Sequence, residues 1–219
     1  MKHEQVKKLT VLAMLCAVAY VIVALVRIPV VLFLKYEPKD VIITFGGFLY
    51  GPLAALLVTT VVSFIEMLTV STTGWIGLVM NILSTAAFSC TAAIVYRKKH
   101  TLSGAVIGLL LGSIAMTVVM LLWNYVLTPL YYMDKARADV AAMLVPVFLP
   151  FNLLKSGLNS AITILLYRPL VQGLRRVGLF PRSESGRAPA RSHKLWVWLG
   201  AAAVLVVCVL LLLHWNNII

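Results

Sequence analysis

The stretch that decides the fold is VIITFGGFLYGPLAALLVTTVVSFIEMLT, residues 41–69. This apolar stretch is longer than the roughly 20 residues that one membrane-crossing helix needs. A pair of glycines and the Gly51-Pro52 dipeptide interrupt it, and the residue before a proline disfavours the helical conformation. We therefore expect a tight helical hairpin, in which Gly47 to Pro52 form the turn between the second and third helices.

The whole chain has the composition of a membrane protein rather than that of a soluble domain. Of its 219 residues, 62% are hydrophobic and 12% are charged, whereas soluble domains have about 45–50% and about 25%. Cys16, Cys90 and Cys208 stand alone without metal-ligand spacing, which argues against disulfide and metal chemistry. The predicted fold class is an all-α integral membrane protein, whose function lies inside the helix bundle or at its rims.

Basic residues form three clusters that orient the helices across the membrane. The clusters lie near the N-terminus, at residues 97–99 and between residues 168 and 194, and the positive-inside rule places each of them in the cytoplasm. The hairpin over residues 41–69 gives the even number of crossings that this requires between the N-terminus and residue 97. Topology thus explains the net charge of +12, which does not indicate a nucleic-acid partner.

Six apolar segments make the predicted core bundle, and a seventh follows a polar linker. The expected helices are residues 9–26, the two arms of the hairpin, 75–96, 101–126 and about 150–170, with residues 138–149 irregular or partly helical. The predicted organisation is a six-helix transmembrane domain at 1–176, a basic cytoplasmic linker at 177–194 and an additional C-terminal transmembrane helix in 195–219. The N-terminus is expected in the cytoplasm and the C-terminus outside.

Polar residues inside the predicted spans are the candidate site residues, because a charge at membrane depth costs at least about 2.5–3.5 kcal/mol. Those in the outer half of the bilayer are Asp40, Glu66, Asn81, Asn124, Asn152 and Lys155. Asn152 and Lys155 share one helical face, where an amide and an ammonium can bind imide-like or carboxylate-like oxygens. Tyr36 and Tyr125 lie near the same rim, either as stacking faces or as interfacial aromatic residues. The alternative is that the polar groups only hold helices together.

Three further features bear on the class of function. Ala13 and Ala17 form a small-xxx-small pattern on the first helix, which allows another helix to approach closely. The four histidines lie at termini or basic turns, and Glu66 has no carboxylate or histidine beside it, so no acid–base pair is available for an enzyme. No Gly-x-x-x-x-Gly-Lys loop is present, and the chain is not expected to use ATP in that way.

Four motifs resemble the substrate-binding S components of energy-coupling factor (ECF) vitamin transporters, most closely those of the riboflavin-specific RibU type. They are LKYEPKD at residues 34–40, GGFLYGP at 46–52, NYVLTPLY at 124–131, and Asn152-x-x-Lys155. The turn motif is shared by many S components, whereas the Asn-Tyr and Asn-x-x-Lys elements favour riboflavin. The resemblance covers about residues 7–176.

This resemblance implies a binding subunit of an importer in the plasma membrane, which captures riboflavin from outside. It implies as partners a transmembrane coupling subunit, which Ala13 and Ala17 would meet, and two ATP-binding-cassette ATPases. Asn124, Asn152 and Lys155 match positions expected to hydrogen-bond the isoalloxazine ring, and the other candidates are assigned from depth alone. Riboflavin is then cargo, so no cofactor, metal ligand or catalytic residue is expected.

Other hypotheses stay open at this point. An S component for another flat ring compound, such as thiamine, a pterin or a modified purine, needs a pocket of similar polarity. A non-transport membrane scaffold would use the buried polar groups as structural contacts, and an intramembrane enzyme would need an acid–base pair at one depth. The residues after Arg176 depart from the resemblance, and a seventh spanning helix there leaves the geometry toward the partners open.

Overall fold

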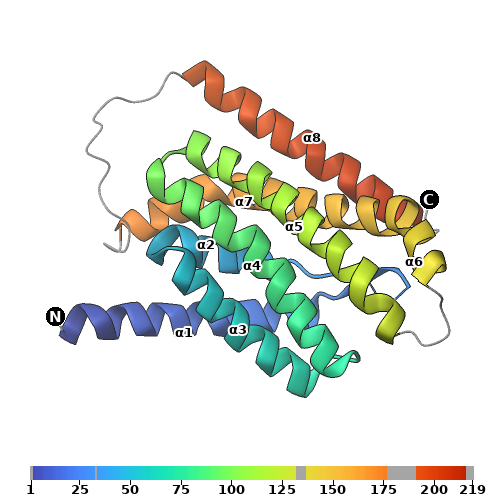
Figure 1. Cartoon of the computed structure of the whole chain (residues 1–219). Coiled ribbons are helices and arrows are strands. Elements are labelled where there is room, and N and C mark those ends of the chain that lie inside the picture. Colours follow the sequence, from blue (N-terminus) through green and yellow to red (C-terminus); the bar gives the residue numbers. More distant parts are fainter. Residues whose placement is uncertain (1, 33, 132–136, 177–190, 216–219) are drawn as a thin grey trace.

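The computed structural model describes residues 2–32, 34–131, 137–176 and 191–215, and most of them are helical (Figure 1). The helices are α1 (Lys2–Leu25), α2 (Lys39–Tyr50), α3 (Pro52–Thr69), α4 (Gly74–Lys98), α5 (Leu102–Tyr131), α6 (Arg137–Met143), α7 (Leu149–Arg176) and α8 (Arg191–Trp215), and a π-helical turn (Leu144–Phe148) joins α6 to α7. Strands β1 (Ile28–Val31) and β2 (Leu34–Tyr36) form an antiparallel hairpin. The predicted helical bundle with an added C-terminal helix is confirmed, and the β-hairpin is an addition to it. Most of the predicted linker, residues 177–190, lies outside the described residues.

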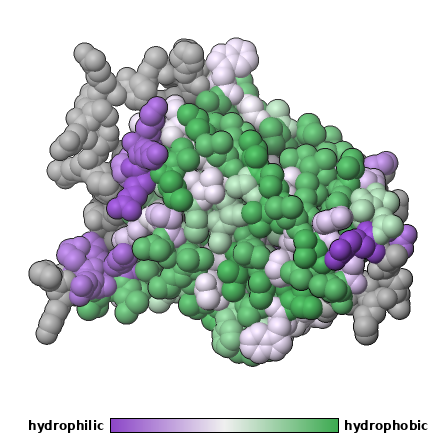
Figure 2. Space-filling view, in the orientation of Figure 1, coloured by the Kyte–Doolittle hydropathy of each residue, from purple (hydrophilic) through white to green (hydrophobic). Residues whose placement is uncertain are grey.

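The bundle has two ends that differ in their connections. We call the basic end the one with the start of α1, the α2–α3 turn, the α4–α5 connection and the end of α7; the hairpin end holds the β1–β2 hairpin, the α3–α4 turn and α6 (Figure 1). Hydrophilic residues gather toward both ends of the surface, with hydrophobic residues between them (Figure 2).

Six helical segments within the described residues are long and apolar enough to cross a membrane: α1, α3, α4, α5, the continuous α6–α7 segment and α8. The chain is a multi-pass membrane protein.

The break predicted between α2 and α3 is confirmed, but the turn is shorter than the predicted Gly47 to Pro52: α2 continues to Tyr50, and Gly51 alone separates it from α3. Gly51 has a φ of 91°, in the left-handed region that favours glycine, and Pro52 begins α3, where its missing N–H costs nothing. At Gly47, an added Cβ would lie 2.9 Å from the Ala93 Cβ. Glycine at this position therefore allows α2 to pack closely against α4.

Helix α2 is shorter than the full membrane span that the sequence suggested. Its 12 residues extend about 18 Å at 1.5 Å per residue, against a hydrocarbon core of about 30 Å. The β1–β2 hairpin supplies the missing length, because strand β2 leads the chain from the hairpin end into the bundle. Asp40, the second residue of α2, therefore lies inside the bundle and is fully buried, rather than at the outer end of a span as predicted.

The sixth predicted span is longer than expected. Pro150 lies in the first turn of α7, as predicted, but the backbone enters α7 from α6 through the π-helical turn instead of starting there. That turn contains Pro146, which cannot donate the backbone hydrogen bond of a regular helix and is accommodated by the local change of pitch. The result is one 37-residue candidate span from Arg137 to Gly173.

Helix α8 packs along α7 and reaches the β1–β2 hairpin. Cys208 and Leu212 of α8 are buried in one cluster with Tyr36 of β2. An added Cβ at Gly157 of α7 would lie 3.2 Å from the Cys208 Sγ, so the two helices approach closely there. Helix α1 contacts α2 and α3 instead and lies on the opposite side of the bundle (Figure 1). The additional helix therefore leaves the outer face of α1 uncovered.

Candidate functional site

A small cavity lies between the β1–β2 hairpin and the hairpin-end halves of α3, α4, α5 and α7. Its volume is about 50 Å³, whereas pockets for drug-sized ligands measure about 300–1,000 Å³. Its polar and charged lining includes Arg27, Lys35, Glu37, Glu66, Asn81, Asn152 and Lys155. A ligand with several rings fits only if the hairpin or the lining side chains move apart.

Asn152 and Lys155 lie on one face of α7, as their spacing predicted. Both side chains are buried, and both line the cavity. Asn152 Nδ2 donates a hydrogen bond of 2.7 Å to the Phe148 carbonyl oxygen, and Lys155 Nζ lies 3.6 Å from Asp40 Oδ2. The wall of the cavity on this side thus carries an amide and an ammonium.

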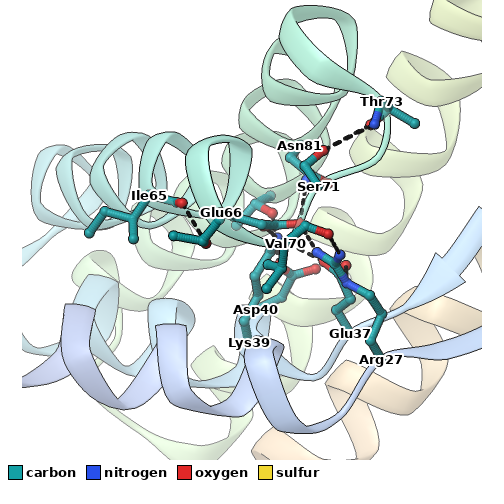
Figure 3. A network of polar contacts seen from close by, with 12 residues as sticks. Arg27, Glu37, Lys39, Asp40, Ile65, Glu66, Val70, Ser71, Thr73 and Asn81 are labelled. Carbon is teal, nitrogen blue, oxygen red and sulfur yellow. Dashed lines mark hydrogen bonds and ion pairs between the residues drawn. The ribbon is translucent and has the colours of Figure 1, made fainter.

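Four charged side chains form a ring at the hairpin end of the cavity (Figure 3). Arg27 pairs with Glu37 at 2.9 Å and with Glu66 at 2.5 Å. Lys39 pairs with the same two carboxylates, at 2.8 Å in the case of Glu37. Asn81 Nδ2 donates a further hydrogen bond of 3.1 Å to Glu66 Oε1. Glu66 and Asn81, which the sequence assigned from depth, therefore line the cavity and also join helices, as the structural alternative proposed.

This charged ring fastens the hairpin to the helices around it. Arg27 follows α1 and also donates a hydrogen bond to the Val70 carbonyl oxygen at the end of α3. Glu37, between β2 and α2, pairs with both Arg27 and Lys39. Its carboxylate therefore joins the start of α2 to the segment that follows α1.

Asp40 is the centre of a second buried network next to the first. Its carboxylate accepts hydrogen bonds from Thr85 Oγ1 of α4 at 2.7 Å and from Asn159 Nδ2 of α7 at 3.1 Å. Asn159 Oδ1 in turn accepts a hydrogen bond of 3.1 Å from the Tyr36 hydroxyl of β2. Tyr36 is itself buried, and through this bond β2 is joined to α7. Asp40 and Tyr36 are thus not among the residues that line the cavity but lie behind Lys155.

The two predicted residues of α5 take different positions. Asn124 is fully buried: its Nδ2 donates to the Met120 carbonyl oxygen at 2.7 Å, and its Oδ1 accepts from Thr128 Oγ1 at 3.0 Å. It lies one helical turn from Met120, which lines the cavity. Tyr125 is 42% exposed, with the Arg137 guanidinium 5.9 Å from its ring centroid. Adjacent helical positions point about 100° apart, so Tyr125 can face the outer surface while Asn124 points inward. The structure therefore does not support Tyr125 as a pocket residue.

Ala13 and Ala17 lie on the exposed face of α1, together with Met14 and Val18. Their positions one turn apart leave a shallow strip between larger side chains. The structure describes no partner on this strip, so its role as a docking surface stays a prediction.

Sequence reasoning missed Asn159 and Thr85 as members of the site. Asn159 lies four residues after Lys155, so the same-face argument used for Asn152 would have found it. Thr85 carried no signal, because a threonine in an apolar helix commonly bonds its own backbone. Among the described residues, no cluster of three or more His, Cys, Asp or Glu side chains is placed to hold a metal ion.

Comparisons with known proteins agree with this architecture. Residues 7–167 match the family model described as ECF transporter, substrate-specific component. The riboflavin transporter RibU of Staphylococcus aureus (strain TCH60) is 33% identical over 182 residues, which cover 80% of this chain and 95% of that protein. The riboflavin transporter FmnP of Bacillus subtilis (strain 168) is 30% identical over 174 residues, 74% of this chain and 91% of that one.

A solved structure is also similar to this chain. It was described in work on the structure and mechanism of the S component of a bacterial ECF transporter, and it matches with a TM-score of 0.67 and 32% sequence identity. The match covers 78% of this chain and 99% of that one. The family match ends at residue 167, so α8 lies beyond it.

Proposed function

Because the chain belongs to the substrate-specific components of ECF transporters, we propose that it captures riboflavin at the outer face of the plasma membrane and delivers it inward. The family is one of transporter components, which is not an enzyme class. Two relatives at 33% and 30% identity bear the name riboflavin transporter, and this supports riboflavin as the cargo of this chain.

The balance of charge in the site is the observation that carries the proposal. Within the described residues, the ion pairs of the site join the half-buried Arg27 and the buried Lys39 and Lys155 to Glu37, Asp40 and Glu66. Their charges cancel, and Lys35, half-buried on β2, adds one positive charge to the cavity wall. A cation such as thiamine would need an uncompensated carboxylate there, and each carboxylate in this set already has a cation partner. An uncharged ring system with carbonyl oxygens, such as riboflavin, fits the site better.

In this proposal, Asn124, Asn152 and Lys155 hydrogen-bond the isoalloxazine ring. Support comes from the cavity: Asn152 and Lys155 line it, and Asn124 lies one turn from a lining residue. The β1–β2 hairpin acts as the cover, because it carries Leu34 and Lys35 of the lining. Riboflavin then enters when the hairpin moves away from α7.

The partners in this proposal are a transmembrane coupling subunit and two ATP-binding-cassette ATPases, which supply the energy. The exposed strip of Ala13 and Ala17 on α1 meets the coupling subunit, and α8 does not obstruct it because α8 lies across the bundle (Figure 1). The basic end faces the cytoplasm, and the hairpin end faces outside. A spanning α8 then places the C-terminus outside.

Binding of riboflavin by the purified protein, followed as quenching of riboflavin fluorescence, tests the proposal. We expect quenching that excess thiamine does not reverse. Reversal of the quenching by thiamine at concentrations below the riboflavin dissociation constant would assign the site to a cationic ligand and overturn the charge argument. Pterins and purines, which are also flat and largely uncharged, are the informative further competitors.

Deleting residues 183–219 is expected to leave riboflavin affinity unchanged and to lower thermal stability. Helix α8 contributes none of the residues that line the cavity, so the binding wall stays complete. The deletion removes Cys208 and Leu212, and the apolar surface of the hairpin and α7 that they cover would be exposed. Riboflavin titration and thermal unfolding of the full and truncated chains in the same detergent measure both effects. Loss of binding in a truncated protein that remains folded would make α8 part of the binding unit.

A further inference from the structure

We propose that Asp40 is the positioning residue for Lys155, and that the β1–β2 hairpin controls this positioning through Tyr36. The inference rests on the proposed function, in which Lys155 contacts the ligand. It assigns to the second buried network a task beyond holding helices together: Lys155 is aligned for the ligand only while the hairpin is closed.

Lys155 needs such a partner because its ammonium sits on a flexible four-carbon stem. Its Nζ lies 3.6 Å from Asp40 Oδ2, and this is its one ion pair among the described residues. That distance is too long for a hydrogen bond. The carboxylate thus attracts the ammonium without occupying its N–H donors, which stay available for the oxygens of a ligand.

Asp40 itself is held in one orientation. Thr85 donates to its Oδ1 at 2.7 Å, and Asn159 donates to its Oδ2 at 3.1 Å. All three side chains are inaccessible to solvent, so water cannot replace either donor. A carboxylate whose two oxygens are fixed by donors on α4 and α7 offers Lys155 a fixed point of attraction.

The hairpin enters this network through Tyr36. Its hydroxyl donates to Asn159 Oδ1 at 3.1 Å, and the neighbouring residues of β2, Leu34 and Lys35, line the cavity. When the hairpin moves away to admit a ligand, Asn159 loses its donor and its amide is free to turn. Asp40 then loses one of its two donors, and Lys155 is held less firmly until the hairpin closes again.

A competing carboxylate makes the position of Lys155 sensitive to Asp40. Glu37, next to Tyr36 in the chain, lines the same cavity as Lys155, so its carboxylate is a second attractor for the ammonium. Without the charge of Asp40, the ammonium is drawn toward Glu37 and the charged ring at the hairpin end. Loss of Asp40 therefore misplaces Lys155 instead of merely loosening the bundle.

A double-mutant cycle on riboflavin affinity tests the positioning role. Asp40→Asn and Lys155→Met are each expected to weaken binding about tenfold or more, and the double variant should bind about as weakly as Lys155→Met alone. Additive losses would overturn the inference, because they would show that Asp40 acts without Lys155. If Lys155→Met binds normally, the proposed site itself fails; if only Asp40→Asn binds normally, the site stands and the positioning role fails.

Ser89→Ala is the matched control. Ser89 and Thr44 form a buried hydrogen bond of 2.9 Å between the same helices, α4 and α2, and neither lines the cavity. This variant is expected to bind riboflavin like the unchanged protein. A loss equal to that of Asp40→Asn would show that any weakened α2–α4 contact lowers affinity, and would overturn the inference.

Tyr36→Phe tests the hairpin link and keeps the inference testable if Asp40→Asn fails to fold. It removes one hydroxyl and leaves the buried ring in place. We expect weaker binding and faster riboflavin release in this variant, and no further loss when it is combined with Lys155→Met. Unchanged affinity and release, or a loss that persists undiminished in the Lys155→Met background, would contradict the link.

Discussion

Lys155→Ala is expected to weaken riboflavin binding by about tenfold to a hundredfold. Asn152→Ala, which removes a neutral donor worth about 0.5–1.5 kcal/mol, is expected to weaken it by about twofold to tenfold, and both proteins should remain folded in the membrane. A hydrogen bond to a charged group is worth about 1.5–3 kcal/mol, and about 1.4 kcal/mol corresponds to a factor of ten in the dissociation constant. Both residues line the cavity from one face of α7, so both changes act on the same wall. Fluorescence titration of the purified variants measures the loss.

Tyr125→Phe is the control for this pair. Tyr125 lies on α5 beside the buried Asn124 but is exposed on the outer surface, so its change should leave affinity as it is. A normal dissociation constant for both the Lys155 and the Asn152 variant would show that the ligand binds elsewhere. A loss confined to Tyr125→Phe would show that the Tyr125 hydroxyl contributes to binding, against its position on the outer surface.

Ala13→Trp combined with Ala17→Trp is expected to abolish riboflavin uptake by cells and to leave riboflavin binding intact. Large side chains on the exposed strip of α1 would keep another helix from approaching closely. The strip lies away from the cavity, since none of the described residues that line the cavity belongs to α1. Uptake of labelled riboflavin by cells, together with titration of the purified variant, separates delivery from capture.

Val206→Trp on α8 provides the matched control for the α1 variants. Val206 is 56% exposed and belongs to the helix on the other side of the bundle, so the same bulky substitution should leave uptake unchanged. If uptake survives in the α1 variant, the alanine strip faces lipid. If it is lost equally in both variants, bulk at any exposed helix face is harmful and the strip has no special role.

The long helices were predictable because apolar segment length and charged flanks determine where a chain crosses a membrane. The fourth helix, expected at residues 75–96, is found at Gly74–Lys98. The turn after α2 followed from Gly51 and Pro52, whose conformational preferences are local. These features depend on residues close together in the chain, which a sequence pattern can report.

The short α2 and the β1–β2 hairpin could not be predicted in this way. Residues 28–36 contain no turn sequence such as Asn-Gly, and the hairpin is fixed by contacts between distant residues. Arg27 reaches Glu66, and Tyr36 reaches Asn159. Hydropathy records how apolar a segment is, but it does not show that a strand, instead of a helix, carries the chain into the bundle.

The depth of the candidate site in the membrane was predictable from the sequence. Which of its side chains pair with one another was not. Depth and spacing brought Asn152 and Lys155 to one wall of the cavity. Which charge faces the cavity and which faces another charge depends on side-chain packing, and so Glu66 and Asp40 proved to be paired with cations. The depth of a polar residue therefore predicts that it belongs to the site. It does not predict that the residue contacts the ligand.

The central claim is that this chain binds riboflavin, and purification from a host that contains riboflavin tests it most directly. The full chain, extracted gently in detergent, is expected to be yellow with the absorption spectrum of a flavin, and the bound compound should be released as riboflavin on denaturation. The ligand-free protein should then quench the fluorescence of added riboflavin. Colourless, folded protein that causes no quenching at any riboflavin concentration tested would contradict the account.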